Sequence, residues 1–350
     1  MKKALVFLCV ILLIIITVES LYIFQNKWFR QNIVESIVKP KPIPKPLTAY
    51  TFENLKKTKF PKNQITLGPV ISETKDFFSQ MFYFSVPKTP TGKQMEKVSG
   101  LANIPKKNGE YPVIVMLRGF IPEESYKPGS GTQPSASQLV KSGFITLAPD
   151  FLGFGESASS SADAFEGRFQ TYTTALTLLS SLPTLNSGLE KIYAGTISAD
   201  LEKIGLWGHS NGGHIALSTL AISEVSYPTV LWSPVSKSFP YSILYYTDEY
   251  DDQGKVMRKS LSDFEKLYDA ELFSPEKYYK WIKAPIEINQ GTADQEVLYW
   301  WSDELVETLK ENNIPVTYFT YPGANHNLVP SGWSSAVLNT IDFYKKEFNK

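Results

Sequence analysis

The sequence predicts an α/β fold in which helices cover both faces of a mostly parallel central sheet. Short apolar runs, typical of strands buried on both faces, recur from residue 111 onward. Longer stretches with helical character lie between these runs. This alternation is typical of βαβ units, and in such sheets binding sites form beyond the carboxyl ends of the strands.

The expected elements follow in a regular order. Three antiparallel strands, separated by proline and glycine turns, are predicted over 64–71, 77–86 and 98–105. The strands of the parallel part are expected over 111–117, 144–148, 204–207, 229–232, 286–289 and 316–321. The helices are expected over 136–141, 165–182, 213–222, 297–311 and 335–347.

Composition and charge are those of a folded protein without a strong overall field. The 350 residues, 43% hydrophobic and 20% charged, suit one large α/β domain with an appendage or two modest domains. Thirty-five basic residues balance thirty-five acidic ones, so the net charge does not favour nucleic acid as a partner. The single cysteine, Cys9, lies in the apolar N-terminal run, which excludes a disulfide or a cysteine nucleophile in the folded part.

Residues 1–25 predict a transmembrane signal-anchor or a signal peptide. Lys2 and Lys3 precede an apolar run over 4–18, and apolar character resumes over 21–24. A helix over 4–24 would measure about 31 Å, which is long enough to span a bilayer. The segment is therefore expected to bring the protein to a membrane.

Alternatives for this segment stay open. Val18 and Ser20 would suit cleavage of a secretory signal, Glu19 interrupts a perfect membrane helix, and a buried core helix is a third possibility. Basic residues also follow the segment over 27–41, which does not favour a cytoplasmic N-terminus. Because two lysines before an apolar run are typical of export signals, the folded domain is expected outside the cytoplasm, anchored or secreted.

A linker is expected over 26–47, followed by one folded domain over 48–350. Residues 39–46 alternate with proline, which fixes φ and removes amide donors, so they predict an extended polyproline II spacer. A recognition site for a proline-binding module is the alternative.

The strongest local signal is the stretch Gly-His-Ser-Asn-Gly-Gly over 208–213. It follows a predicted strand and precedes a predicted helix, as a nucleophile elbow requires. Gly208 and Gly212 are needed because the turn is tight enough for a Cβ to clash there. The turn would raise the Ser210 hydroxyl above the sheet and place the Asn211 amide at a helix N-terminus, where it can stabilise an oxyanion.

A serine hydroxyl needs a base, and the chain has three histidines. His209 and His214 flank the serine and are expected to pack and orient the turn. His326 lies in a loop just after the last predicted strand, so it is the best general base. The alternative for His326 is a loop histidine without a catalytic role.

The base needs a carboxylate to fix its tautomer, and Asp294 follows the strand that ends near 289. Glu296, Asp248 and Asp251 are the competitors for this role.

The second oxyanion donor is expected in the loop after the 111–117 strand, with the Phe120 amide as the best candidate. Arg118, just before it, is either a surface ion-pair partner or a residue that shapes this loop.

These motifs resemble those of the α/β-hydrolase superfamily over about 65–350, and within it the catalytic domain of prolyl oligopeptidase-type proteins. The similarity rests on the 208–213 elbow, the stretch over 148–157, the Ser-Pro and Ala-Pro pairs over 274–285, and the Gly-Thr-Ala-Asp loop over 291–294. The resemblance implies an α/β-hydrolase fold and the nucleophile, acid and base roles for Ser210, Asp294 and His326.

Two departures from the pattern of prolyl oligopeptidases stand out. The residues before the catalytic region are too few for a propeller. In addition, Arg118-Gly119-Phe120 replaces the usual His-Gly-Gly.

An insert rich in aromatic residues is expected over 233–282, between two strands. It would stand over the strand ends as a lid or acyl-binding wall, or else pack on the body for stability.

The sequence therefore predicts a serine hydrolase that acts on a small ester, amide or peptide through an acyl-enzyme, without a metal or organic cofactor. A carboxylic-ester hydrolase is preferred. The alternatives are a prolyl oligopeptidase-like peptidase, an acyltransferase to another acceptor, and a catalytically silent, membrane-tethered binding protein.

Overall fold

The computed structural model describes residues 2–35, 44–248 and 251–350, in two compact units, Met1–Lys45 and Pro46–Lys350. In the first unit, α1 (Lys2–Glu35) carries the apolar N-terminal run. Its segment Leu5–Phe29 has 25 residues and a mean hydropathy of 2.7, with no burial in that window. By length and composition it can cross a membrane, and a signal sequence meets the same criteria. Most of the predicted polyproline spacer, 39–43, lies outside the described residues.

The second unit is built on a nine-stranded sheet with the strand order β1-β2-β3-β5-β4-β6-β7-β8-β9. The pairs β1–β2, β2–β3 and β3–β5 are antiparallel, whereas every pair from β5 to β9 is parallel. This confirms the predicted mostly parallel sheet. The strands are β1 (Thr66–Glu73), β2 (Phe77–Pro87), β3 (Met95–Pro105), β4 (Gly109–Leu117), β5 (Ile145–Pro149), β6 (Ile197–His209), β7 (Thr229–Trp232), β8 (Ile286–Gly291) and β9 (Val316–Tyr321).

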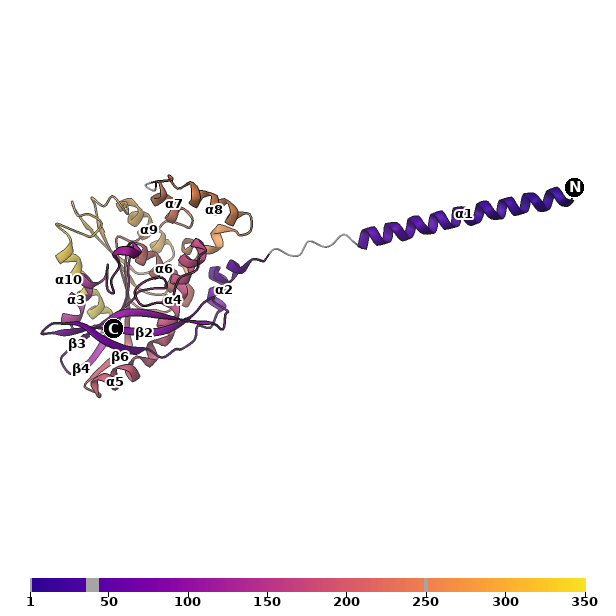
Figure 1. Ribbon diagram of the computed structural model, residues 1–350. Helices are drawn as coiled ribbons and strands as arrows, with labels where there is room; N and C mark the ends of the chain where they lie inside the picture. The colour runs from indigo at the N-terminus through magenta and orange to yellow at the C-terminus, as the bar shows by residue number, and fades with distance from the viewer. Residues whose placement is uncertain (1, 36–43, 249–250) are drawn as a thin grey trace. The chain divides into compact units, whose positions relative to one another are not determined.

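Helices cover both faces of this sheet (Figure 1). They are α2 (Phe52–Lys57), α3 (Gln133–Lys141), α4 (Ala164–Ser181), α5 (Leu185–Tyr193), α6 (Asn211–Ser223), α7 (Tyr241–Thr247), α8 (Lys255–Glu265), α9 (Tyr299–Glu311) and α10 (Trp333–Phe348). The short helices α2, α5, α7 and α8 were not among the elements predicted above.

The period-two alternation of β4 shows how the two faces are filled. Val113 and Val115 join the larger core cluster together with residues of α4 and α6. Ile114 and Met116 point the other way and join a second cluster with residues of α3 and α10. Because both faces of its second half are apolar, β4 is buried on both sides over 113–117, which includes its carboxyl end.

Candidate active site

Ser210 occupies a sharp turn at the carboxyl end of β6. It has φ 56° and ψ −124°, between the end of β6 at His209 and the start of α6 at Asn211. A positive φ is uncommon for a residue with a Cβ and costs on the order of 1–3 kcal/mol, so the surrounding structure must enforce it. A Cβ added at Gly212 would lie only 1.9 Å from the carbonyl oxygen of Leu117. The glycine therefore lets α6 start directly against the end of β4, which brings Ser210 to the rim of the sheet.

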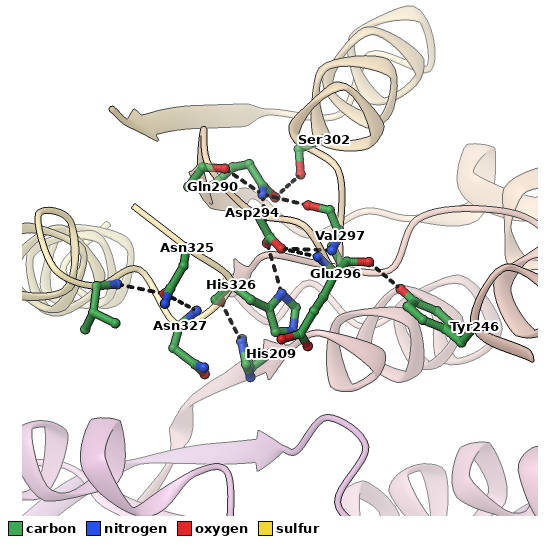
Figure 2. A network of polar contacts seen from close by, with 12 residues as sticks. His209, Tyr246, Gln290, Asp294, Glu296, Val297, Ser302, Asn325, His326 and Asn327 are labelled. Atoms are coloured by element: carbon green, nitrogen blue, oxygen red, sulfur yellow. Dashed lines mark hydrogen bonds and ion pairs between the residues drawn. The ribbon is translucent and has the colours of Figure 1, made fainter. Parts of the chain in front are cut away.

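Asp294 and His326 form a buried pair at the same rim (Figure 2). The Nδ1 of His326 lies 2.9 Å from Oδ2 of Asp294, and Gln290 donates to the same oxygen at 3.1 Å. The other oxygen, Oδ1, accepts from the backbone amides of Glu296 at 3.0 Å and Val297 at 2.9 Å. Burial opposes ionisation of Asp294, but the bonds from His326 and Val297 outweigh it and hold the pKa below its ordinary value.

This pair fixes the tautomer of His326. A carboxylate only accepts hydrogen bonds, so Nδ1 carries the hydrogen and Nε2 of the neutral ring is an acceptor. The carboxylate of Glu296 lies 3.6 Å from Nε2, on the opposite side of the ring from Asp294. Of the competing acids, Glu296 therefore faces the wrong nitrogen to replace Asp294, and Asp248 forms an ion pair with Arg258.

Ser210 and His326 line one cavity of about 450 Å³. No hydrogen bond joins the two side chains in the part of the chain that the structure describes. Catalytic hydrogen bonds are often long or misaligned without substrate. The structure thus brings the serine, the base and the acid to one rim, with the base–acid contact formed and the serine–base contact open.

The other two histidines support the turn. The Nε2 of His209 donates to the carbonyl oxygen of His326 at 3.0 Å, and the two rings are tilted by 40° with their centroids 4.7 Å apart. Burial and the neighbouring His326 lower the pKa of His209 to about 4. His214 is fully buried against the hydroxyl of Tyr172 at 2.9 Å, and burial holds its pKa well below the usual range. Both stay neutral near pH 7 and act as packing and orienting groups, as expected.

The loop after β4 is braced from beneath by Arg118. Its side chain is buried, and it donates to the carbonyl oxygens of Gly119 and Asp150, each at 3.0 Å. Its guanidinium also lies 4.0 Å from the ring centroid of Phe154. Arg118 is thus a loop-shaping residue and not a surface ion-pair partner.

Gly119 is a residue that the sequence reasoning missed. A Cβ at this position would lie 2.9 Å from Cβ of Ser210, so only glycine lets the loop approach the serine this closely. Phe120 and Asn211, the predicted oxyanion donors, both line the cavity beside Ser210. The signal in the sequence that could have indicated this close approach was the glycine itself, between Arg118 and Phe120.

The insert over 233–282 divides into two parts. Ser242, Ile243 and Tyr246 of α7 line the cavity, and the Tyr246 hydroxyl donates to the carbonyl oxygen of Glu296 at 3.1 Å. The aromatic residues Phe239, Phe264 and Phe273 instead pack on Phe165 and Phe169 of α4. One part thus forms a wall of the cavity and the other packs on the body.

Comparisons with known proteins agree with this architecture. The model of the prolyl oligopeptidase family matches residues 183–350, and that of chlorophyllase matches residues 93–232. The chain is 25% identical over 209 residues to dipeptidyl peptidase family member 6 of Caenorhabditis elegans, which covers 57% of this chain but only 26% of that protein. It is 26% identical over 245 residues to the uncharacterized peptidase YtmA of Bacillus subtilis (strain 168), covering 67% of this chain and 83% of that protein.

A solved structure gives the same fold over a greater length. The acetyl xylan esterase from Paenibacillus sp. R4 superposes with a TM-score of 0.55 at 16% identity, covering 88% of this chain and 96% of that one. A nine-stranded, mostly parallel sheet, a serine turn between β6 and α6, and these similarities together define the superfamily: the chain belongs to the α/β-hydrolases.

Proposed function

We propose that this protein is a serine hydrolase that cleaves a carboxylic ester through an acyl-enzyme. The observation that carries the proposal is the shared cavity of Ser210 and His326, with His326 held by Asp294 at 2.9 Å. The matched families support hydrolysis of an ester or an amide by a serine nucleophile. The cavity of about 450 Å³ suits a small substrate.

The first step forms the acyl-enzyme. Ser210 Oγ attacks the ester carbonyl carbon while its proton passes to Nε2 of His326, and Asp294 stabilises the imidazolium that results. The negative charge on the carbonyl oxygen rests on the backbone amides of Asn211 and Phe120. Collapse of the tetrahedral intermediate breaks the bond to the alcohol, which takes the proton from His326.

The second step repeats the first with water as the nucleophile. His326 takes a proton from water, the hydroxide attacks the acyl carbon, and the bond to Ser210 Oγ breaks as His326 returns the proton. The acid product then leaves. The carboxylate of Glu296, 3.6 Å from Nε2, adds a favourable charge whenever the ring is protonated.

A peptidase is the second candidate, because the prolyl oligopeptidase match covers the stretch that contains Ser210, Asp294 and His326. An amide leaving group needs the proton from His326 more than an ester does, so the two candidates share the site and differ in substrate. A panel of p-nitrophenyl esters of increasing chain length and X-Pro amides separates them by their kcat/KM values.

The experiment that tests the nucleophile is labelling with a fluorophosphonate probe. We expect the unaltered protein to be labelled and Ser210→Ala to be unlabelled and inactive on the whole panel. Ser331→Ala, whose hydroxyl donates to the carbonyl of Pro322, is the matched control and keeps its labelling. Equal labelling of Ser210→Ala would refute the assignment.

We also propose that α1 anchors the protein in a membrane, or directs its secretion, with the hydrolase unit outside the cytoplasm. Its apolar segment Leu5–Phe29 supports this proposal. Protease treatment of intact cells, followed by detection of the fluorophosphonate label, tests it: the label is lost if the unit faces outward and kept if it faces the cytoplasm.

A further inference from the structure

One cation in the wall of the active-site cavity has no acidic partner. Arg168 lies on α4 and lines the cavity together with Ser210. Its Nη2 donates to Oγ of Ser242 at 3.3 Å, while its Nε is buried and has no hydrogen-bond partner. No carboxylate among the described residues forms an ion pair with it.

This state differs from that of the other arginines in the described part of the hydrolase unit. Arg118 is buried too, and its Nε likewise has no partner, but its two terminal nitrogens donate to carbonyl oxygens and its guanidinium lies over an aromatic ring. Arg258 pairs with Asp248 at the surface. A guanidinium offers five N–H donors in a planar fork, and a buried donor without a partner is destabilising. Apart from the hydrogen bond to Ser242 and an interaction with Tyr172, Arg168 therefore keeps donors for a group that the protein itself does not supply.

The surroundings of Arg168 select the kind of group. Ser242 holds one end of the fork from α7, and apolar Ile243 and the ring of Tyr246 line the same wall. Glu296, also in the lining, is 68% exposed and sits next to His326, so it does not neutralise Arg168. A half-buried, fixed cation beside apolar walls suits a carboxylate, which matches the guanidinium fork with two parallel hydrogen bonds.

We propose that Arg168 recognises a carboxylate on the substrate, so that the preferred ester carries an acid group on its acyl or its alcohol part. The inference rests on the proposed function of Ser210, and it specifies the substrate class of that same site. Charge-assisted bonds of this type contribute more than neutral ones and favour the anionic substrate over an uncharged analogue of the same shape.

The test compares kcat/KM for matched ester pairs. For the acyl side, the mono-4-nitrophenyl ester of adipic acid is set against its methyl-capped, neutral analogue. For the alcohol side, 4-acetoxybenzoate is set against 4-acetoxybenzamide. The side on which the anionic member is preferred tells which part of the ester meets Arg168, and activity of Ser210→Ala is subtracted as background.

In Arg168→Gln the anionic-to-neutral ratio is expected to fall roughly 10- to 100-fold on the preferred side. Arg168→Lys keeps the charge but loses the planar fork, so its anionic-to-neutral ratio is expected to lie between those of the unaltered enzyme and Arg168→Gln. Arg258→Gln, a matched change outside the cavity lining, keeps the unaltered ratio. Should Arg168→Gln fail to fold, Arg168→Lys still tests the proposal, since a ratio equal to that of the unaltered enzyme would contradict it.

The experiment distinguishes failure of the carboxylate inference from failure of the proposed function. If neither pair shows a preference for the anion, although Ser210-dependent hydrolysis is present, the carboxylate inference is wrong and the proposed function stands. An unchanged ratio in Arg168→Gln also overturns the inference alone. If no ester is hydrolysed by a Ser210-dependent route, the ester hydrolase proposal fails and takes this inference with it.

Discussion

The proposed proton transfer joins Ser210 to the His326–Asp294 pair, and the structure holds these two ends in different ways. At one end, Asp294 and His326 are joined by side-chain hydrogen bonds, and the backbone amides of Glu296 and Val297 complete the carboxylate's contacts. At the other end, Ser210 is held by the backbone alone, through a positive φ and the close approach of Gly212 to Leu117. The base is thus oriented before a substrate arrives, whereas the serine still has to complete its contact with Nε2.

The largest effect is expected at the hydrogen-bonded end. Asp294→Asn keeps the shape of the side chain, but an amide stabilises no imidazolium and presents a donor where His326 needs an acceptor. We expect kcat to fall about 10³- to 10⁴-fold. Steady-state kinetics on the best ester measures it.

Asp303→Asn is the control, because Asp303 accepts a hydrogen bond from Tyr318 and does not line the cavity. A kcat for Asp294→Asn close to that of the unaltered enzyme would mean that Asp294 does not orient the base.

The second effect concerns the backbone-held end. In Gly119→Ala the new Cβ would lie 2.9 Å from Cβ of Ser210, so either the loop or the serine must move. Displaced oxyanion donors lower kcat, and we expect a loss of about 10- to 100-fold with a smaller change in KM.

Gly167→Ala is the matched control, since its Cβ would make only an ordinary contact at 3.5 Å. If Gly119→Ala loses no more activity than this control, the close approach of the loop to Ser210 has no catalytic consequence.

A third effect links the two ends through His209, which donates from β6 to the carbonyl oxygen of His326. Its pKa is lowered from 6.5 to about 4 in the folded protein. A lowered folded-state pKa means that the unfolded chain binds the proton more tightly. The contribution of His209 to the free energy of unfolding is therefore complete above pH 6.5. It is lost as the pH falls toward 4, at about 1.4 kcal/mol per pH unit.

Urea unfolding of the hydrolase at about pH 7.5 and about pH 5 measures this dependence. The free energy of unfolding of His209→Gln, which keeps a donor but does not titrate, should fall less steeply with pH than that of the unaltered protein. Parallel pH profiles for the two proteins would show that His209 does not carry the shift.

The smallest effect is expected in the insert. Tyr246→Phe removes the hydrogen bond to the carbonyl oxygen of Glu296, which ties α7 to the loop that holds Asp294. The free energy of unfolding should drop by about 1 kcal/mol, with a few-fold change in kcat/KM. Tyr241→Phe, in the same helix and with an exposed ring, is the control for thermal unfolding and kinetics. A drop of the same size in both variants would mean that the tie to Glu296 contributes nothing.

The sequence predicted the parallel part of the sheet well where apolar runs mark it. The observed bounds of β7 and β9 match the predicted 229–232 and 316–321. In contrast, β6 begins at Ile197 instead of 204. Its first half pairs with 109–112 of β4, beyond a register shift, but is polar. It therefore shows no apolar run from which the sequence could predict a strand. Helix α9 starts at Tyr299, two residues later than expected, since the Val297 amide is bonded to Asp294.

For the site, the sequence supplied the residue types and their order along the chain. The catalytic roles of these residues stay predictions until they are tested. It could not supply contacts that depend on how separate loops fold against each other. Glu296 at Nε2 of His326 is one such contact, and Arg118 under the 119–121 loop is another. The position of Arg168 beside Ser242, without an acidic partner among the described residues, is a third, because it depends on α4 and α7 meeting in space.

The arginine beneath the loop after β4 has a consequence for how the enzyme responds to acidity. A histidine at that place would gain or lose a proton in the physiological range and alter the loop that it supports. Burial lowers the pKa of Arg118 from its ordinary value, yet a guanidinium keeps its proton in proteins. The support for Gly119 and Phe120 is therefore the same in mildly acidic and mildly alkaline surroundings.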